Sequence, residues 1–196
     1  PSGIAIYLAP AAKGLGQAVP GSKPDQLDML FEGARQLARL EAVGQPAVLV
    51  NRYSGSRPDG WERNLPAYES LRIRDLYPDT DLLLRTESGQ VEYAFAIGPQ
   101  GKAEAIRLRF AGTRRLSLSK EGDLVVEARN GRVLRHRAPL AVEHGASGTR
   151  PLPASFRIDG SDTVSFSVRD RREGTRLTID PVINFGTYFG GSHYEA

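Results

Sequence analysis

Large apolar side chains recur at every second position along most of this chain, and this period of two constrains the fold more than any other feature. The segment 91–97 reads VEYAFAI, and Gly98-Pro99 ends it. Successive side chains of a strand point to opposite faces of a sheet, so such a run predicts a strand with one buried and one solvent-facing side. Helical periodicity is scarce. The sequence therefore predicts an all-β fold with a minor helical part.

Similar runs occur from one end of the sequence to the other. They cover residues 4–8, 27–31, 71–73, 106–110, 116–118, 124–128, 132–137, 156–158, 164–168 and 177–179. Asn130-Gly131 and Asp159-Gly160 each stand between two runs, where they predict tight hairpin turns. Roughly a dozen short strands, about ten residues apart, predict antiparallel hairpins in a sandwich-like or two-part stacked arrangement.

Three stretches depart from clear alternation. Ala11–Pro24 is rich in Gly, Ala and Pro, and Tyr53–Pro66 contains several Ser, Gly and Pro residues, so both predict irregular loops. Residues 34–42 fit a short helix, because Leu37 and Leu40 are three positions apart, but they also alternate as a strand does. We favour the strand for this segment.

The composition excludes several kinds of site and partner. None of the 196 residues is cysteine, so neither disulfides nor thiolate-bound metals hold the fold. The 26 Lys and Arg residues only slightly exceed the 23 Asp and Glu residues, which argues against a nucleic-acid-binding face. No apolar run approaches the roughly 18 residues that a membrane-spanning helix requires. No signal-peptide core follows Pro1, so we expect any targeting segment to lie outside this sequence.

Three aspartates form the densest polar cluster in the sequence: Asp75, Asp79 and Asp81 surround Pro78. Carboxylates two residues apart on a tight loop can supply several of the oxygen ligands that Ca²⁺ requires. However, the alternating pattern of a full calcium loop is absent, and Asp beside Pro is common turn chemistry. We therefore expect a structural turn first and a calcium-like site second.

The histidines carry the case for an enzyme. His136, His144 and His193 show no metal-binding spacing, and no Gly-x-Ser-x-Gly elbow occurs. The neighbours of His136 predict that its side chain is exposed on a strand. A hydrolase with a dispersed triad stays open as an alternative if His136 or His144 lies beside an acid and a serine. The prediction is nevertheless that the protein is not an enzyme.

Aromatic residues offer a binding hypothesis. Trp61, Tyr53 and Tyr68 lie in or beside the second irregular stretch, and Arg63 is close in sequence. Exposed rings with neighbouring arginines could stack on sugars, which makes a carbohydrate-binding module an alternative function. The opposing interpretation is that Trp61, the single tryptophan, packs over the end of a sheet.

Four arginines could form a basic stripe if their strands pair. They are Arg72, Arg74, Arg107 and Arg109, each at an outward position of its run. Such residues more often form the solvated faces of amphipathic strands. We therefore expect no nucleic-acid partner.

Four segments, in order, resemble landmarks of one bacterial domain. They are LRIRDLYPDTDLLL (71–84), VEYAFAI (91–97), IRLRFAG (106–112) and GDLVV (122–126). The family is that of secreted proteins with SBBP repeats, which form β-propellers, and the resemblance is to their uncharacterised N-terminal domain. The sequence IDPV at 179–182, followed by GTYFGGS at 186–192, resembles the junction with the first repeat.

The resemblance implies a β-rich domain over residues 1–181, which could divide into two subdomains near 66–85. Residues 182–196 would then be a linker or the start of the first repeat. It also implies an extracellular or cell-surface location, and it supplies no catalytic residue and no cofactor.

The function implied by the resemblance is that of a structural or interaction module. It would cap or dock against the downstream repeats or other surface proteins and contribute to assembly or adhesion, because the edge of a repeat array needs cover. Residues 184–188, NFGTY, distinguish two cases. If they add as a strand to this domain, docking is favoured, whereas a free segment favours a simple tether.

Overall fold

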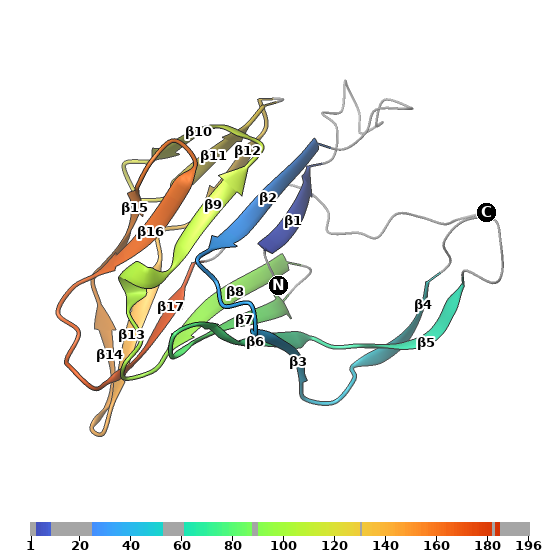
Figure 1. The fold of residues 1–196 in the computed structure, drawn as a ribbon, viewed down its shortest axis with the longest axis horizontal. Helices are drawn as coiled ribbons and strands as arrows, with labels where there is room; N and C mark the ends of the chain where they lie inside the picture. Colours follow the sequence, from blue (N-terminus) through green and yellow to red (C-terminus); the bar gives the residue numbers. More distant parts are fainter. Residues whose placement is uncertain are drawn as a thin grey trace.

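The computed structural model describes residues 3–8, 25–52, 61–87, 90–129, 131–181 and 183–184. These residues form 18 β-strands, and their one helical element is the short 3-10 helix η2 (Ala103–Ala105) (Figure 1). The all-β prediction is confirmed, and every described strand pair is antiparallel.

The largest sheet has seven strands in the order β14-β13-β17-β8-β7-β6-β3. Their bounds are β3 (Arg39–Val43), β6 (Ser70–Tyr77), β7 (Thr80–Glu87), β8 (Gln90–Ile97), β13 (Leu140–Gly145), β14 (Gly148–Leu152) and β17 (Arg176–Asp180). Strands β6, β7 and β8 follow one another as a meander, and β17 returns from late in the sequence to pair with β8. Strands from both sides of residues 66–85 thus share this sheet.

Two smaller sheets complete the body of the protein. The five-stranded sheet, in the order β1-β2-β9-β16-β15, contains β1 (Gly3–Leu8), β2 (Asp25–Glu32), β9 (Arg107–Ala111), β15 (Ala154–Ile158) and β16 (Thr163–Val168). The four-stranded sheet, in the order β10-β11-β12-β18, contains β10 (Thr113–Leu118), β11 (Leu124–Ala128), β12 (Val133–His136) and β18 (Ile183–Asn184). The predicted hairpins at 130–131 and 159–160 join β11 to β12 and β15 to β16.

A two-stranded ribbon, β4 (Val48–Arg52) and β5 (Glu62–Ala67), extends away from the sheets (Figure 1). Val48 pairs with Ala67, and slightly earlier in the hairpin Val43 of β3 pairs with Ser70 of β6. Strands β3 and β4 are therefore two halves of one side of a long hairpin, and β5 and β6 are the two halves of the other. We call the outer half, β4 with β5, the arm.

The three larger sheets share one hydrophobic core. Phe95 of the seven-stranded sheet lies 5.6 Å, centroid to centroid, from Phe166 of the five-stranded sheet. The ring centroid of His136, in the four-stranded sheet, lies 5.4 Å from that of Phe110 in the five-stranded sheet and 6.0 Å from that of Tyr93 in the seven-stranded sheet. Edge-to-face packing of this kind adds to the free energy gained by burying the rings. The body is thus held together where the sheets meet.

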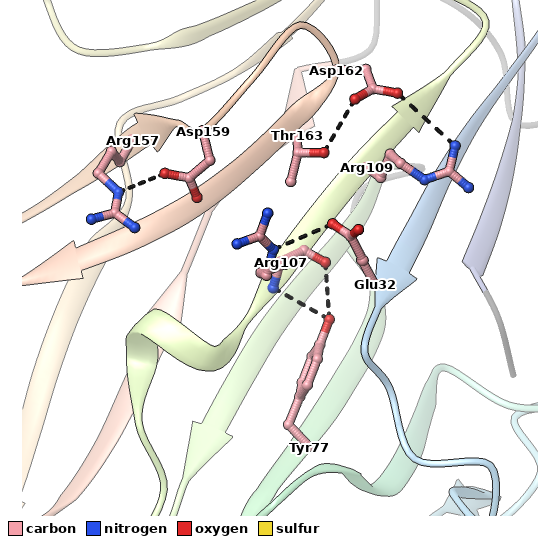
Figure 2. Close-up of polar contacts among 8 residues, drawn as sticks. All are labelled: Glu32, Tyr77, Arg107, Arg109, Arg157, Asp159, Asp162 and Thr163. Carbon is pink, nitrogen blue, oxygen red and sulfur yellow. Dashed lines mark hydrogen bonds and ion pairs between the residues drawn. The ribbon is translucent and has the colours of Figure 1, made fainter.

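Tyr77 makes a polar link between two sheets inside this core. Its ring is 2% exposed at the end of β6, and its hydroxyl donates to the main-chain carbonyl of Arg107 on β9 at 3.0 Å (Figure 2). The main-chain N–H of Arg107 points back at the same hydroxyl, 3.4 Å away. Burial raises the pKa of Tyr77 to about 12, so the hydroxyl keeps its proton for this bond.

Replacing Tyr77 with phenylalanine is expected to lower the free energy of unfolding by about 1 kcal/mol, because the part-buried main-chain groups of Arg107 lose their partner. Urea denaturation monitored by circular dichroism measures this change. The same substitution at the half-buried Tyr68, which follows β5, serves as the control and should have a smaller effect. Equal losses for the two variants would contradict a specific role for the Tyr77 bond.

Some predicted elements differ from those observed. Residues 34–38 form turns, and the strand begins only at Arg39, so strand rather than helix is correct for the second half of 34–42. The predicted loop Tyr53–Pro66 is wrong for residues 62–66, which form most of β5. Its remaining part up to Gly60, like the predicted loop Ala11–Pro24, lies outside the described residues. The number of strands exceeds the prediction because β4, β5, β7, β13 and β14 lack a strict alternation.

Candidate functional site

An open groove of about 560 Å³ crosses one face of the seven-stranded sheet. Cross-strand register places Asp81, Ala96 and Thr178 side by side on this face, opposite the face that carries Leu82, Phe95 and Ile179. The acidic and basic residues at the groove are Arg72, Asp75, Asp79, Asp81 and Arg176, and His144 lies beside them. The fold thus brings the three predicted aspartates together and adds basic groups to them.

Asp79 and Asp81 bond to main-chain groups, Asp81 within the β6–β7 hairpin and Asp79 across to the loop after β8. Asp75 and Asp79 have positive φ angles of 52° and 51°, which a short carbonyl-bearing side chain tolerates. Asp81 Oδ1 accepts a hydrogen bond from the main-chain N–H of Asp75 at 2.9 Å, and Asp79 Oδ2 accepts one from Gln100 at 2.7 Å. Among the described residues, no group of three or more His, Asp or Glu side chains is placed to hold a metal ion. The observed contacts are those of a structural turn.

The described histidines are bonded to hydroxyl groups. His144 Nε2 lies 2.9 Å from Thr178 Oγ1 in the groove, and His136 Nδ1 lies 3.1 Å from the hydroxyl of Tyr93 in the core. Neither bond joins a histidine to a carboxylate, which a dispersed catalytic triad would require. His193 lies outside the described residues.

The prediction that His136 is exposed is wrong. Strand β12 buries Leu134 and His136 and exposes Val133 and Arg135, so the imidazole lies at 0% exposure. Two adjacent apolar residues, Val133 and Leu134, left the inward face of this strand ambiguous in the sequence. Burial lowers the pKa of His136 to about 3, because no charged partner offsets the loss of water around an imidazolium. Its Nε2 is buried without a hydrogen-bond partner in the described part of the chain.

Sequence reasoning missed a buried carboxylate, Glu143. Its Oε2 accepts hydrogen bonds from Arg150 Nε and Nη2 at 3.0 and 2.9 Å, and its Oε1 accepts one from the main-chain N–H of Arg172 at 2.6 Å. Thr175 Oγ1 also donates to Oε1 at 3.0 Å. These donors, led by the Arg172 N–H, lower the pKa of Glu143 to about 2. The sequence did contain a clue: Glu143 is two positions after Ala141, so both side chains point to the same, buried face of β13.

The Glu143 contacts anchor the loop between β16 and β17, and Arg171 fixes it further. Arg171 Nη1 donates to the Gly101 carbonyl and its Nη2 to the Gly98 carbonyl, both at 2.7 Å. The loop and residues 99–102 line a second open groove of about 610 Å³. The arginine side chain therefore spans two loops, and it has no need of a ligand to be satisfied.

The predicted aromatic group is not assembled as one platform. Trp61 directly precedes β5 and Tyr68 directly follows it, so the strand separates the Cα atoms of the two residues by about 20 Å. Both rings are half-buried, and Arg63 is exposed on β5. Tyr53 lies outside the described residues.

The four arginines do not form a basic stripe, because β6 and β9 belong to different sheets. Each guanidinium instead lies near an acid: Arg74 Nε is 2.6 Å from Glu41 Oε2, and Arg107 Nε is 3.3 Å from Glu32 Oε2. Figure 2 shows the Arg107 pair together with the contact of Arg109 with Asp162. The positive charge on these strands is largely balanced locally.

The chain passes from one sheet to another at its described C-terminal end. Strand β17 ends at Asp180 in the seven-stranded sheet, and Pro181 is buried. Ile183 and Asn184 of β18 then pair with His136 and Arg135 at the edge of the four-stranded sheet. We call this pairing of β18 with β12 the seam. It places the first two residues that follow Val182 in a sheet of this domain.

Residues 9–182 match a sequence family described as "Domain of unknown function (DUF7948)". The chain belongs to this family. The matched region includes the strands from β2 to β17 and ends directly before β18. No curated protein and no solved structure matches the chain. The family assignment identifies the domain but assigns it no activity.

No helix in the described parts of the chain is long and apolar enough to cross a bilayer.

Proposed function

We propose that this domain is a non-enzymatic, extracellular interaction module that docks against a β-propeller repeat region in a bacterial surface or secreted protein. In that place it would cap the repeats and contribute to assembly or adhesion. The identity of the repeats comes from the resemblance of residues 71–126 and 179–192 to proteins with SBBP repeats. The structural observation that supports docking is the seam.

The seam holds the chain after Pro181 from two sides. Upstream, β17 is hydrogen-bonded to both β13 and β8 in the interior of the seven-stranded sheet. Downstream, β18 adds to the edge of another sheet. Only two residues, Pro181 and Val182, separate the end of β17 from β18. A segment fixed at both ends has little freedom, so whatever follows it starts from a defined position and direction.

The outer edge of β18 offers a way to continue the sheet. In the described residues β18 is the last strand of its sheet, and an edge strand presents unpaired N–H and C=O groups to a further strand. A repeat array likewise ends in an exposed edge that needs cover. Pairing of these two edges would satisfy both, which is the physical basis of capping.

Features that would favour other functions are engaged in the fold itself. Asp79 and Asp81 accept hydrogen bonds from main-chain N–H groups, and the described histidines bond hydroxyls. The arginines expected on a nucleic-acid-binding surface pair with acids. These contacts support a structural role for the domain.

Proline substitutions in β18 test the proposal in the full-length protein. Ile183→Pro and Asn184→Pro, made separately, each remove one N–H, and in an antiparallel pair only one of two successive residues directs its N–H at a given neighbour. The variant at the residue whose N–H points at β12 is expected to raise amide hydrogen exchange in β12 by about tenfold. The other variant is expected to leave this exchange largely unchanged. The radius of gyration from small-angle scattering should also rise as the repeats move away.

Ser117→Pro in β10 is the matched control, because it affects the opposite edge of the same sheet. It should increase exchange in β11 without changing the orientation of the repeats. If the unmodified protein already shows freely oriented repeats, or if neither β18 variant alters the scattering, the domain is a tethered neighbour and docking is ruled out.

A further inference from the structure

Exposed apolar side chains are concentrated in one segment of the chain. Of the nine large apolar side chains that are exposed in the described residues, six lie between residues 37 and 50. They are Leu37, Leu40, Val43, Val48, Leu49 and Val50. The other three, Leu118, Val133 and Leu140, lie singly on three other strands. This concentration of exposed apolar side chains in one segment points to a surface used in protein association.

The segment also contains a free sheet edge. Strand β3 is the last strand of the seven-stranded sheet and pairs on one side, with β6, within the described part of the chain (Figure 1). Leu40 is 61% exposed, although it lies directly across from Ile73, which is 4% exposed. The core-facing side of the sheet thus continues onto β3 and is left uncovered there.

The sequence of this edge is symmetric about Leu40. Residues 37–43 read Leu-Ala-Arg-Leu-Glu-Ala-Val, so that an apolar residue, a small residue and a charged residue flank Leu40 in the same order on both sides. The two charges have opposite signs. We infer that β3 pairs antiparallel with β3 of a second copy of this chain, with Leu40 opposite Leu40 on a two-fold axis.

This register makes every pair complementary. Within β3, Arg39 lies opposite Glu41 of the second copy and Leu40 opposite Leu40. Ala38 and Leu37, in the turn before β3, come opposite Ala42 and Val43 where the pairing extends the strand by two residues. By the two-fold symmetry each pair except the central one occurs twice. Opposite charges directly across from each other stabilise a sheet, and like charges destabilise it. Within one chain Arg39 faces Arg74 across the β3–β6 pair, and Arg74 is bonded to Glu41. In the dimer Glu41 of each copy would therefore contact Arg74 of its own chain and Arg39 of the other.

Neighbouring registers lack this complementarity. If the sheet continues with the same face toward the core, residues of equal parity must lie opposite each other. A register centred on Glu41 places two glutamates opposite each other and Arg39 opposite Val43. A register centred on Arg39 places two arginines opposite each other and Glu41 opposite Leu37. Only the register centred on Leu40 pairs both charges with opposite charges.

The arm adds apolar surface to the same association. Strand β4 is exposed along its whole length, with Val48 and Val50 on one side of the ribbon and Leu49 on the other. A two-stranded ribbon in water has little stability of its own. In the antiparallel dimer each arm extends past Leu37 of the second copy, where part of its apolar surface can be covered.

Sedimentation equilibrium of the chain over a wide range of concentration tests this inference. The unmodified chain is expected to form dimers, and Leu40→Lys is expected to raise the dissociation constant by at least about tenfold. Leu140→Lys is the matched control, because Leu140 is similarly exposed, at 67%, on another strand. Equal weakening by both variants would indicate unspecific apolar contact and overturn the inference.

Charge exchange tests the register. Arg39→Glu places two acids opposite each other in each pair, and Glu41→Lys places two bases there, so each variant alone should be monomeric. A mixture of the two variants restores both attractive pairs and should give a heterodimer. Circular dichroism and melting curves show whether each variant is folded. If Glu41→Lys does not fold, the dissociation constant of Leu40→Lys decides whether the dimer forms through β3. A chain that stays monomeric at all concentrations, or folded variants that do not recover in the mixture, would rule out this dimer.

Discussion

Acidification below pH 6.5 is expected to destabilise the protein by up to about 1.4 kcal/mol for each pH unit, because His136 must remain neutral to stay buried. The folded-state pKa, about 3, lies below the value of 6.5 for an exposed imidazole. The stabilisation from the neutral ring is therefore complete above pH 6.5 and decreases as the pH falls toward 3. At pH 4.5 the expected loss is about 3 kcal/mol.

The cause lies in the surroundings of the ring. The aromatic rings of Tyr93, Phe110 and Phe156 surround His136, with centroids 6.0, 5.4 and 6.5 Å away. The hydroxyl of Tyr93 is the one group bonded to it in the described residues. Burial also raises the pKa of this hydroxyl, so Tyr93 supplies no negative charge that could stabilise an imidazolium. Protonation therefore requires the three sheets to separate.

Urea denaturation between pH 7 and pH 5 measures this effect before most carboxylates titrate. The double variant His136→Phe/Tyr93→Phe serves as the control, because it keeps two aromatic rings and removes both polar groups. Its free energy of unfolding should vary much less with pH over this range. Identical pH dependence in the two proteins would show that another group is responsible.

Replacing Glu143 with glutamine is expected to lower the melting temperature by about 3 to 12 °C, because hydrogen bonds to a charged group contribute about 1.5 to 3 kcal/mol and a domain of this size melts about 2 to 4 °C lower for each kcal/mol lost. The carboxylate side chain is 2% exposed and accepts four hydrogen bonds. An amide keeps the shape but turns one acceptor into a donor, which then faces the donors of Arg150 or Arg172. The loop at 169–175 should also become more susceptible to proteolysis.

Glu62→Gln is the matched control, because Glu62 pairs with Arg52 at 2.6 Å on the exposed arm. Exposed ion pairs contribute little, so this variant should melt within about 2 °C of the unmodified protein. The pH dependence adds a second readout. The pKa of Glu143 is lowered from 4.5 to about 2, so its stabilisation is complete above pH 4.5 and is lost as the pH falls toward 2. A Glu143 variant that behaves like the control would contradict the proposed role of the network.

The strands could be predicted where one face of a strand is apolar and the other polar. Residues 91–97 and 124–128 show this alternation and form β8 and β11. Strands β4 and β5 could not be predicted in this way, because the arm has no buried face to impose alternation. The inward face of β12 was ambiguous for a related reason, since Val133 and Leu134 are both apolar.

The groups at the candidate site were predictable only in part. Asp75, Asp79 and Asp81 are close in sequence, and the structure places all three at one groove. The partners of Glu143 come from residues 150, 172 and 175, on other parts of the chain. Local spacing carries no information about such contacts, because the pairing of β13 with β14 and β17 creates them.

The sequence by itself determined that this protein is built from short antiparallel strands joined by tight turns. Alternation and turn formation depend on the geometry of a few neighbouring residues, which the sequence states directly. Only the tertiary structure decided that β17 lies between β13 and β8, that β18 pairs with β12, and that His136 lies where three sheets meet. These features depend on which strands pair across long separations, and that choice is made by packing of the whole core.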